Sequence, residues 1–213
     1  MATKSLDGVL TKKAHRTEKF TEDQVSDLLK CADQHDGYLY FSKNFFYIQH
    51  SVKGKLLFSP FEYQIRLMHS YHNYRFNINM LPRQSGKTTC ASAYLLWYAM
   101  FHPDQTILVA AHKYTGAQEI MQRIRYAYED CPDHIRCGVV SYNKGSIEFD
   151  NGSRIVSATT TGNTGRGMSI SLLYCLDGDT TTVKIRNKNT LVEEELTLVN
   201  LYGRLAGAEK IIA

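Results

Sequence analysis

Apolar residues recur at helical spacing in the first part of the chain. Val25, Leu28 and Leu29 form the apolar face of a helix that Thr21 begins as a capping box, and Gly37 closes this region. Residues 38–58 alternate aromatic and polar side chains, a pattern that predicts short strands or an extended arm. The N-terminal residues 1–37 are therefore expected to form a helical segment that precedes the main domain.

A second group of helices is expected between residues 59 and 129. Ser59 is a suitable N-cap, Pro60 favours the first helical position, and Glu62 would complete a capping box. Helical periodicity then covers residues 91–101, which are almost entirely apolar, and residues 114–129.

Strand patterns alternate with these helices. Residues 76–80 alternate apolar and polar, while residues 106–111 are continuously apolar, as in a buried parallel strand. The sequence Asp150-Asn151-Gly152 predicts a hairpin turn between two short strands, and residues 169–174 form another apolar run. The order of elements predicts an α/β domain with a mainly parallel sheet and flanking helices.

The sequence Gly86-Lys87-Thr88 lies between a predicted strand and a predicted helix. Backbone N–H groups at a helix start bind phosphates, Lys87 would reach the β- and γ-phosphates of a nucleotide, and Thr88 would ligate Mg²⁺. A full Walker A motif would have glycine at the position of Leu81, so this is a degenerate phosphate-binding loop. The alternative is a solvated Gly-Lys-Thr turn.

Residues around this loop extend the candidate site. Arg83 lies inside the loop and faces the γ-phosphate like an arginine finger in one interpretation, or is a surface arginine in the other. Tyr63 and Gln64, about twenty residues upstream, are candidates for adenine recognition. The complete set of expected nucleotide contacts is Tyr63, Gln64, Arg83, Gln84, Ser85, Gly86, Lys87, Thr88 and Thr89.

The order of these segments resembles the N-terminal ATPase domain of the large terminase subunit of tailed phages, over residues 38–174. The matching segments are EYQIRLM, LPRQSGKTT, ILVAAHK, NKGSIEFDNGSRI and TTTGNTGRGMSISLLY. The resemblance implies a P-loop NTPase fold of the RecA and helicase type and an ATP-driven motor that packages double-stranded DNA. It also implies ATP and Mg²⁺ as cofactors, and the portal and the small terminase subunit as partners.

The last apolar run does not end as this family requires. A Walker B strand is followed by Asp-Glu, whereas Tyr174 is followed by Cys175-Leu176-Asp177-Gly178-Asp179. In one interpretation Asp177 is the Walker B acid, and Gly178 replaces the glutamate that polarises the attacking water. Cys175 could alternatively be a buried cysteine of the core with no chemical role.

In the other interpretation, CLDGDT resembles the first block of an intein, a protein-splicing element, with Cys175 as its nucleophile. Two predicted strands, residues 181–186 and 190–198, follow it and suit the β-rich intein fold. Residues 175–213 are too few for a full intein and resemble the N-terminal piece of a split intein. A second polypeptide would then supply the remaining intein, the Walker B acids and the nuclease domain.

Composition and charge add few restrictions. The net charge of +4 permits nucleic-acid contact without requiring it; Lys113, Arg123, Arg125 and Arg166 are candidates for DNA contact by charge alone. Five cysteines without framework spacing indicate reduced thiols. The absence of an apolar run of about 18 residues and of a secretory segment predicts no membrane span and the host cytoplasm.

We therefore expect an N-terminal helical segment (1–37), the N-terminal part of a terminase ATPase domain (38–174) and a split-intein fragment (175–213). Before splicing, this chain would hydrolyse ATP poorly because the Walker B acids lie on another polypeptide. The alternatives are a stand-alone helicase-like ATPase that uses Asp177, and a truncated, inactive terminase.

Overall fold

The computed structural model describes residues 10–160, 165, 167–176, 182–186, 193–197 and 200. Its helices are α1 (Glu22–Ala32), α2 (Gly37–Asn44), α3 (Glu62–Asn73), α4 (Lys87–Phe101) and α5 (Tyr114–Asp130). Its strands are β1 (Tyr47–His50), β2 (Gly54–Leu57), β3 (Thr106–Ala111), β4 (Val139–Tyr142), β5 (Ser146–Phe149), β6 (Arg154–Thr159), β7 (Leu172–Leu176), β8 (Thr182–Arg186) and β9 (Glu193–Thr197).

The capping box predicted at Thr21 is confirmed. The Thr21 side chain accepts a hydrogen bond from the Gln24 N–H, and the Gln24 Oε1 accepts one from the Thr21 N–H at 2.9 Å. Side chains of the same segment thus supply hydrogen-bond acceptors for backbone N–H groups at the start of α1.

The predicted start of α3 is wrong by two residues. Phe61, not Ser59, is the N-cap, and Gln64 Oε1 accepts a hydrogen bond from the Phe61 N–H at 2.9 Å. Because Gln64 supplies this acceptor at the third helical position, the helix begins at Glu62 and Pro60 stays outside it.

The strands predicted throughout residues 38–58 are only partly present. β1 and β2 form an antiparallel hairpin, but residues 37–44 form a helix, and Gly37 begins that helix instead of closing α1. Tyr38 and Phe41, three residues apart, are both fully buried, so the buried positions follow the spacing of a helix and not the alternation of a strand. A Cβ at Gly37 would overlap the Cys31 carbonyl oxygen, which explains the glycine.

The main sheet has the strand order β4-β5-β6-β3-β7 and is mixed, not mainly parallel as predicted. β3 pairs in parallel with β6 and β7, whereas β4, β5 and β6 form an antiparallel meander. The hairpin predicted around Asn151 is confirmed as the β5–β6 connection. Since turns this short can join only antiparallel strands, half of the sheet cannot be parallel.

The strand predicted over residues 76–80 is absent. Phe76 is 83% exposed and Met80 54% exposed, and no strand lies between α3 and α4. Alternation supplies an apolar face, but a strand also needs a partner for its backbone groups. Within the described residues, β7 pairs with β3 on one edge, and no described strand occupies the other.

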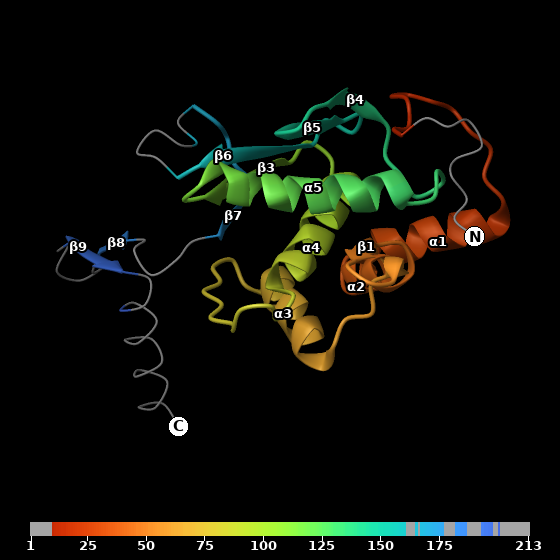
Figure 1. Ribbon diagram of the computed structural model, residues 1–213. Helices are drawn as coiled ribbons and strands as arrows, with labels where there is room; N and C mark the ends of the chain where they lie inside the picture. The colour runs from red at the N-terminus through yellow and green to blue at the C-terminus, as the bar shows by residue number, and fades with distance from the viewer. Residues whose placement is uncertain are drawn as a thin grey trace.

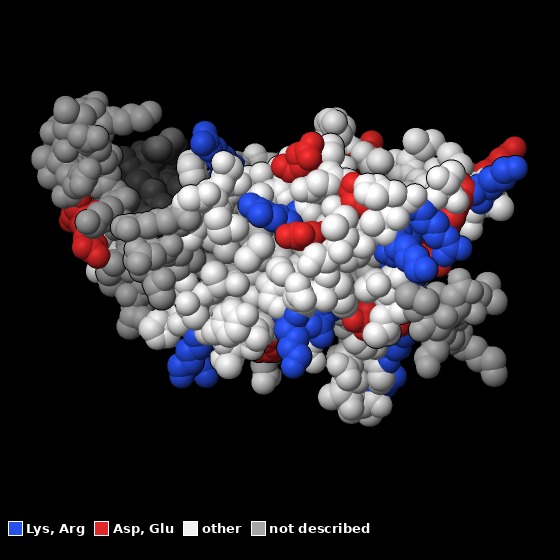
Figure 2. Space-filling model, turned by 90° about the horizontal axis from the view of Figure 1, so that it is seen from above, with Lys and Arg blue, Asp and Glu red and all other residues white. Residues whose placement is uncertain are grey.

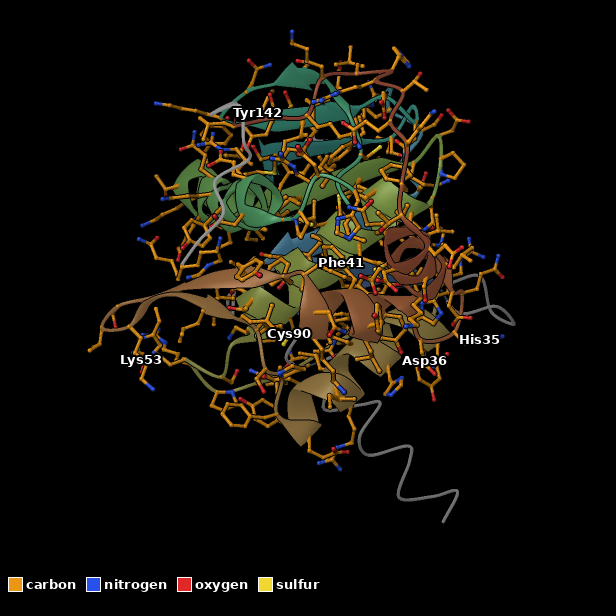
Figure 3. The ribbon with its side chains drawn as sticks, turned by 90° about the vertical axis from the view of Figure 1, so that its right-hand side faces the viewer. His35, Asp36, Phe41, Lys53, Cys90 and Tyr142 are labelled. Carbon is orange, nitrogen blue, oxygen red and sulfur yellow. The ribbon has the colours of Figure 1, made fainter. Side chains whose placement is uncertain are left out.

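One core joins the helices to the sheet. In Figure 1, α5 lies along the five-stranded sheet and the other helices lie below α5, and Figure 3 shows Phe41 and Cys90 among these helices. Trp97 of α4 is fully buried, and its Nε1 donates a hydrogen bond to the Cys31 carbonyl at 2.7 Å. The N-terminal helix α1 therefore packs on the same core as α4.

Helix α4 is apolar on nearly all sides because α2, α3 and α5 surround it. Even so, none of the helices in the described part of the chain is long and apolar enough to cross a membrane.

The strands expected after Cys175 are present. β8 and β9 lie inside the predicted ranges 181–186 and 190–198 and pair with each other as an antiparallel two-stranded sheet. They are not part of the main sheet, and Figure 1 shows them beyond the end of β7.

Candidate phosphate-binding site

The loop in front of α4 has the backbone geometry of an anion site. Gln84 has φ = 62° and Gly86 has φ = 74°, so two left-handed residues flank Ser85. Such alternation curves the backbone and directs successive N–H groups toward one side. Gly86 is the N-cap of α4 and supplies no side-chain acceptor, so the positive end of the helix keeps its N–H groups for a ligand.

The predicted phosphate ligands are brought together at this helix start. Lys87 Nζ lies 3.4 Å from the Leu81 carbonyl oxygen and donates a hydrogen bond to it, so the ammonium group lies across the loop. Thr88 and Thr89 follow in the first turn of α4 and are half-buried, whereas Arg83 is exposed at the entry to the loop. The loop thus combines a cation, hydroxyl groups and the N–H groups of the helix, the groups that a nucleotide phosphate with Mg²⁺ requires.

Ser85 adds an unsatisfied polar atom to the loop. Its Oγ is buried and has no hydrogen-bond partner within the described residues. A buried hydroxyl without a partner is costly, and a bound phosphate would satisfy it. This observation fits the bound group that the loop sequence predicts.

Tyr63 and Gln64 lie against the loop, as their predicted role requires, but their polar atoms are already engaged. Tyr63 Oη and Gln64 Nε2 both donate to the Ser85 carbonyl oxygen, at 2.8 Å and 3.0 Å. Gln64 is only 5% exposed, and its Oε1 accepts the hydrogen bond from the Phe61 N–H. One N–H of its amide is left for an adenine.

Phe61 is a neighbouring residue that the sequence alone did not single out. Its ring is parallel to that of Tyr63, with centroids 5.9 Å apart and an interplanar angle of 9°. Phe61 is 67% exposed and Tyr63 39% exposed, so the two rings form an apolar surface beside the loop. The sequence pattern did not indicate Phe61, because the predicted helix start at Ser59 and Pro60 put it inside the helix instead of at its N-cap.

A cavity of about 380 Å³ lies on another side of the α4 start. It is bounded by the β1 hairpin and α5 and reaches the loop region only at Thr89. Its lining residues are Phe46, Tyr47, Ile48, Gln49, His50, Ser51, Thr89, Glu119, Gln122, Arg123 and Tyr126. No sequence pattern indicated this cavity, because its walls come from segments far apart in the chain.

Strand β7 brings Tyr174 close to α4. Burial raises the pKa of the Tyr174 hydroxyl to about 12, with a further contribution from the nearby Cys90 of α4. Cys175 is exposed, which excludes the interpretation as a buried core cysteine, and its backbone aligns with Ala110 of β3. The strand continues one residue further to Leu176, and the alternative acid Asp177 lies outside the described residues.

The described candidates for DNA contact, Lys113, Arg123 and Arg125, lie at the start of α5 or within it. On the face seen in Figure 2, Lys and Arg are interspersed with Asp and Glu. Arg123 forms an ion pair with Glu119 at 2.8 Å, and the Arg125 guanidinium lies 5.7 Å from the Tyr142 ring centroid. Lys113 is exposed at the N-cap of α5, and Arg166 lies outside the described residues.

Residues 78–180 match the family model described as terminase large subunit, T4likevirus-type, N-terminal. The match spans just under half of the 213 residues and includes the whole phosphate-binding loop and β7. It supports a phage terminase large subunit, the class of protein that the sequence motifs resemble. It ends six residues beyond Tyr174, and it does not include the helices α1–α3.

Proposed function

We propose that this chain is the N-terminal part of the DNA-packaging motor of a tailed phage and binds ATP with Mg²⁺ at residues 83–89. The observation that carries the proposal is the uncapped start of α4, with Lys87 across the loop, inside the segment that matches the terminase family. Double-stranded DNA, the portal and the small terminase subunit would be its partners in the host cytoplasm.

Each loop residue has a proposed role. The N–H groups around Gly86 and the Lys87 ammonium bind the β- and γ-phosphates, and the Thr88 hydroxyl ligates Mg²⁺. Arg83, exposed at the loop entry, faces the γ-phosphate. The bound nucleotide supplies the phosphoanhydride bond whose hydrolysis drives packaging. The rings of Phe61 and Tyr63 provide a stacking surface for adenine.

We further propose that residues from Cys175 onward are the N-terminal fragment of a split intein. Two observations support this part of the proposal. Cys175 is exposed, as a nucleophile must be, and the two strands that follow β7, β8 and β9, form a two-stranded sheet separate from the main sheet. Trans-splicing would join Tyr174 to a polypeptide that begins with Cys, Ser or Thr and continues with Asp-Glu.

The first step of this reaction converts a peptide bond to a thioester. The Cys175 Sγ attacks the Tyr174 carbonyl carbon, the C–S bond forms and the C–N bond breaks, and the thiol proton ends on the released Cys175 amine. The first residue of the partner segment then captures the acyl group. The partner fragment also supplies the assisting histidine and the terminal asparagine that cyclises.

The test is to mix the purified chain with the candidate polypeptide from the same phage genome and to measure intact masses. We expect a ligated product that contains residues 1–174, no such product from Cys175→Ala, and normal ligation by the control Cys137→Ala. A phage genome that encodes no polypeptide with the intein remainder and the Asp-Glu pair rules out the splicing part.

A second candidate function is a stand-alone ATPase that uses Asp177 as its Walker B acid. It is favoured by the parallel pairing of β7 with β3, which continues through Cys175 to Leu176, and by the family match, which extends to residue 180. In the sequence Asp177 comes directly after this apolar strand, at the position that the second candidate function requires for its Walker B acid. ATP turnover by the purified chain, lost in Asp177→Asn, distinguishes this function from the first.

A further inference from the structure

We propose that Gln64 and Tyr63 are positioning residues that hold the phosphate-binding loop in its ligand-binding conformation. This inference rests on the proposed nucleotide site and assigns these two residues a role on the loop backbone that is independent of the nucleotide base.

The two side chains converge on one backbone atom. Gln64 Nε2 and Tyr63 Oη donate to the Ser85 carbonyl oxygen at 3.0 Å and 2.8 Å, so both lone pairs of that oxygen are engaged by the first turn of α3. The other end of the Gln64 amide accepts the Phe61 N–H at 2.9 Å, which fixes the amide plane. The loop is therefore anchored to the N-terminus of a helix 21 residues earlier in the chain.

Fixing this carbonyl also fixes an N–H group of the site. None of the peptide bonds in the described part of the chain is cis, so the Gly86 N–H points opposite to the Ser85 C=O. Because the carbonyl points toward α3, the Gly86 N–H points away from α3. A peptide flip would exchange the two groups and present a carbonyl oxygen, which repels phosphate, in place of a donor.

The glycine at position 86 is consistent with this arrangement. A Cβ on Gly86 would overlap Gln64 Nε2, and the residue has φ = 74°, which side chains rarely allow. The amide of Gln64 thus packs directly on the backbone that it orients.

The test separates backbone positioning from base recognition by its choice of ligand. Affinity is measured by titration calorimetry for MgATP and for inorganic tripolyphosphate, which has the phosphates but no base. Gln64→Glu keeps the acceptor for the Phe61 N–H and loses the donor to Ser85. Tyr63→Phe keeps the ring and loses only the hydroxyl.

We expect each variant to lose about 3- to 10-fold in affinity, and by the same factor for both ligands. A loss confined to MgATP, with tripolyphosphate affinity unchanged, overturns the inference and assigns the residues to the base. Unchanged affinity for both ligands in both variants overturns it as well.

Gln24→Glu is a matched control for the helix cap. Gln24 occupies the same capping position in α1, where its Oε1 accepts the Thr21 N–H at 2.9 Å, and its side chain has no described contact with the loop. We expect no change in affinity from this variant. If the unaltered chain binds neither ligand, the proposed nucleotide site itself is wrong. If the chain and its variants bind both ligands equally well, the site stands and only the positioning role of Gln64 and Tyr63 is wrong.

Discussion

The Gln64 side-chain amide of α3 donates a hydrogen bond to the Ser85 carbonyl oxygen, 3.0 Å away, in the loop that begins α4. The same amide caps α3 through the Phe61 N–H. A single side chain therefore sets both where α3 begins and how the loop backbone is turned. The N-terminus of α3 is therefore hydrogen-bonded directly to the backbone of the proposed phosphate site.

Gly86→Ala should disrupt this contact. The alanine would adopt an unfavourable left-handed φ, at about 1–2 kcal/mol, and its Cβ would displace the Gln64 amide. We expect a lower Tm and a loss of tripolyphosphate binding, measured by calorimetry. Gly54→Ala is the matched control, because Gly54 has φ = 69° with no atom near its Cβ position. Equal destabilisation by the two variants would show that the Gln64 contact contributes nothing.

Trp97→Phe should destabilise the whole domain. The substitution removes the indole N–H that donates to the buried Cys31 carbonyl at 2.7 Å and leaves a cavity in the core. We expect a loss of about 2–3 kcal/mol in the free energy of unfolding, measured by urea denaturation with circular dichroism. Tyr98→Phe, which loses only a 3.5 Å contact to Gln105, should change it by less than about 0.5 kcal/mol. A near-neutral Trp97→Phe would mean that α1 is not anchored to the core.

Alkylation should distinguish Cys175 from the other cysteines. Burial raises the pKa of the Cys31, Cys90 and Cys137 thiols to about 12, and it raises that of Cys131 further. At about pH 8 these thiols are almost entirely protonated and therefore unreactive. We expect iodoacetamide to modify the exposed Cys175 first in the folded chain, as located by peptide mass spectrometry. Faster modification of Cys90 or Cys131 would contradict the described burial.

Asp150 should contribute stability that acid removes. Burial raises its pKa, but hydrogen bonds from the Cys137 thiol and the His15 N–H outweigh this effect and lower the pKa below the ordinary 3.8. A carboxylate with a depressed folded-state pKa stabilises the fold above its unfolded pKa, and this stability disappears as pH falls through the folded pKa. The Tm advantage over Asp150→Asn should therefore shrink from about pH 6 to about pH 3. A constant difference in Tm over this range would contradict the assignment.

Local signals in the sequence were sufficient for elements that depend on their own residues. The Thr21 capping box, the turn at Asn151 and the apolar strand β3 were all predicted correctly because each is encoded within a few positions. The strand expected over residues 76–80 failed because pairing depends on a partner strand elsewhere in the chain. α2 was missed because the aromatic and polar residues of 38–58 alternate in part, whereas the buried pair Tyr38 and Phe41 has the three-residue spacing of a helix.

The candidate site was predictable in its loop and not in its surroundings. Lys87 and Thr88 were found because a phosphate loop has a local sequence signature. The bond from Gln64 to Ser85 and the stacking of Phe61 on Tyr63 depend on how α3 packs beside the loop, which no short segment encodes. The cavity that reaches Thr89 could not be predicted either, because its lining residues come from separate segments of the chain.

We propose that this chain binds nucleotide but lacks its catalytic acids until a second polypeptide supplies them. MgATP binding and turnover by the purified, unspliced chain test this directly, with Lys87→Ala as the control for binding. We expect binding that Lys87→Ala abolishes, and no turnover above background before ligation. Turnover by the chain alone that Asp177→Asn removes would contradict it.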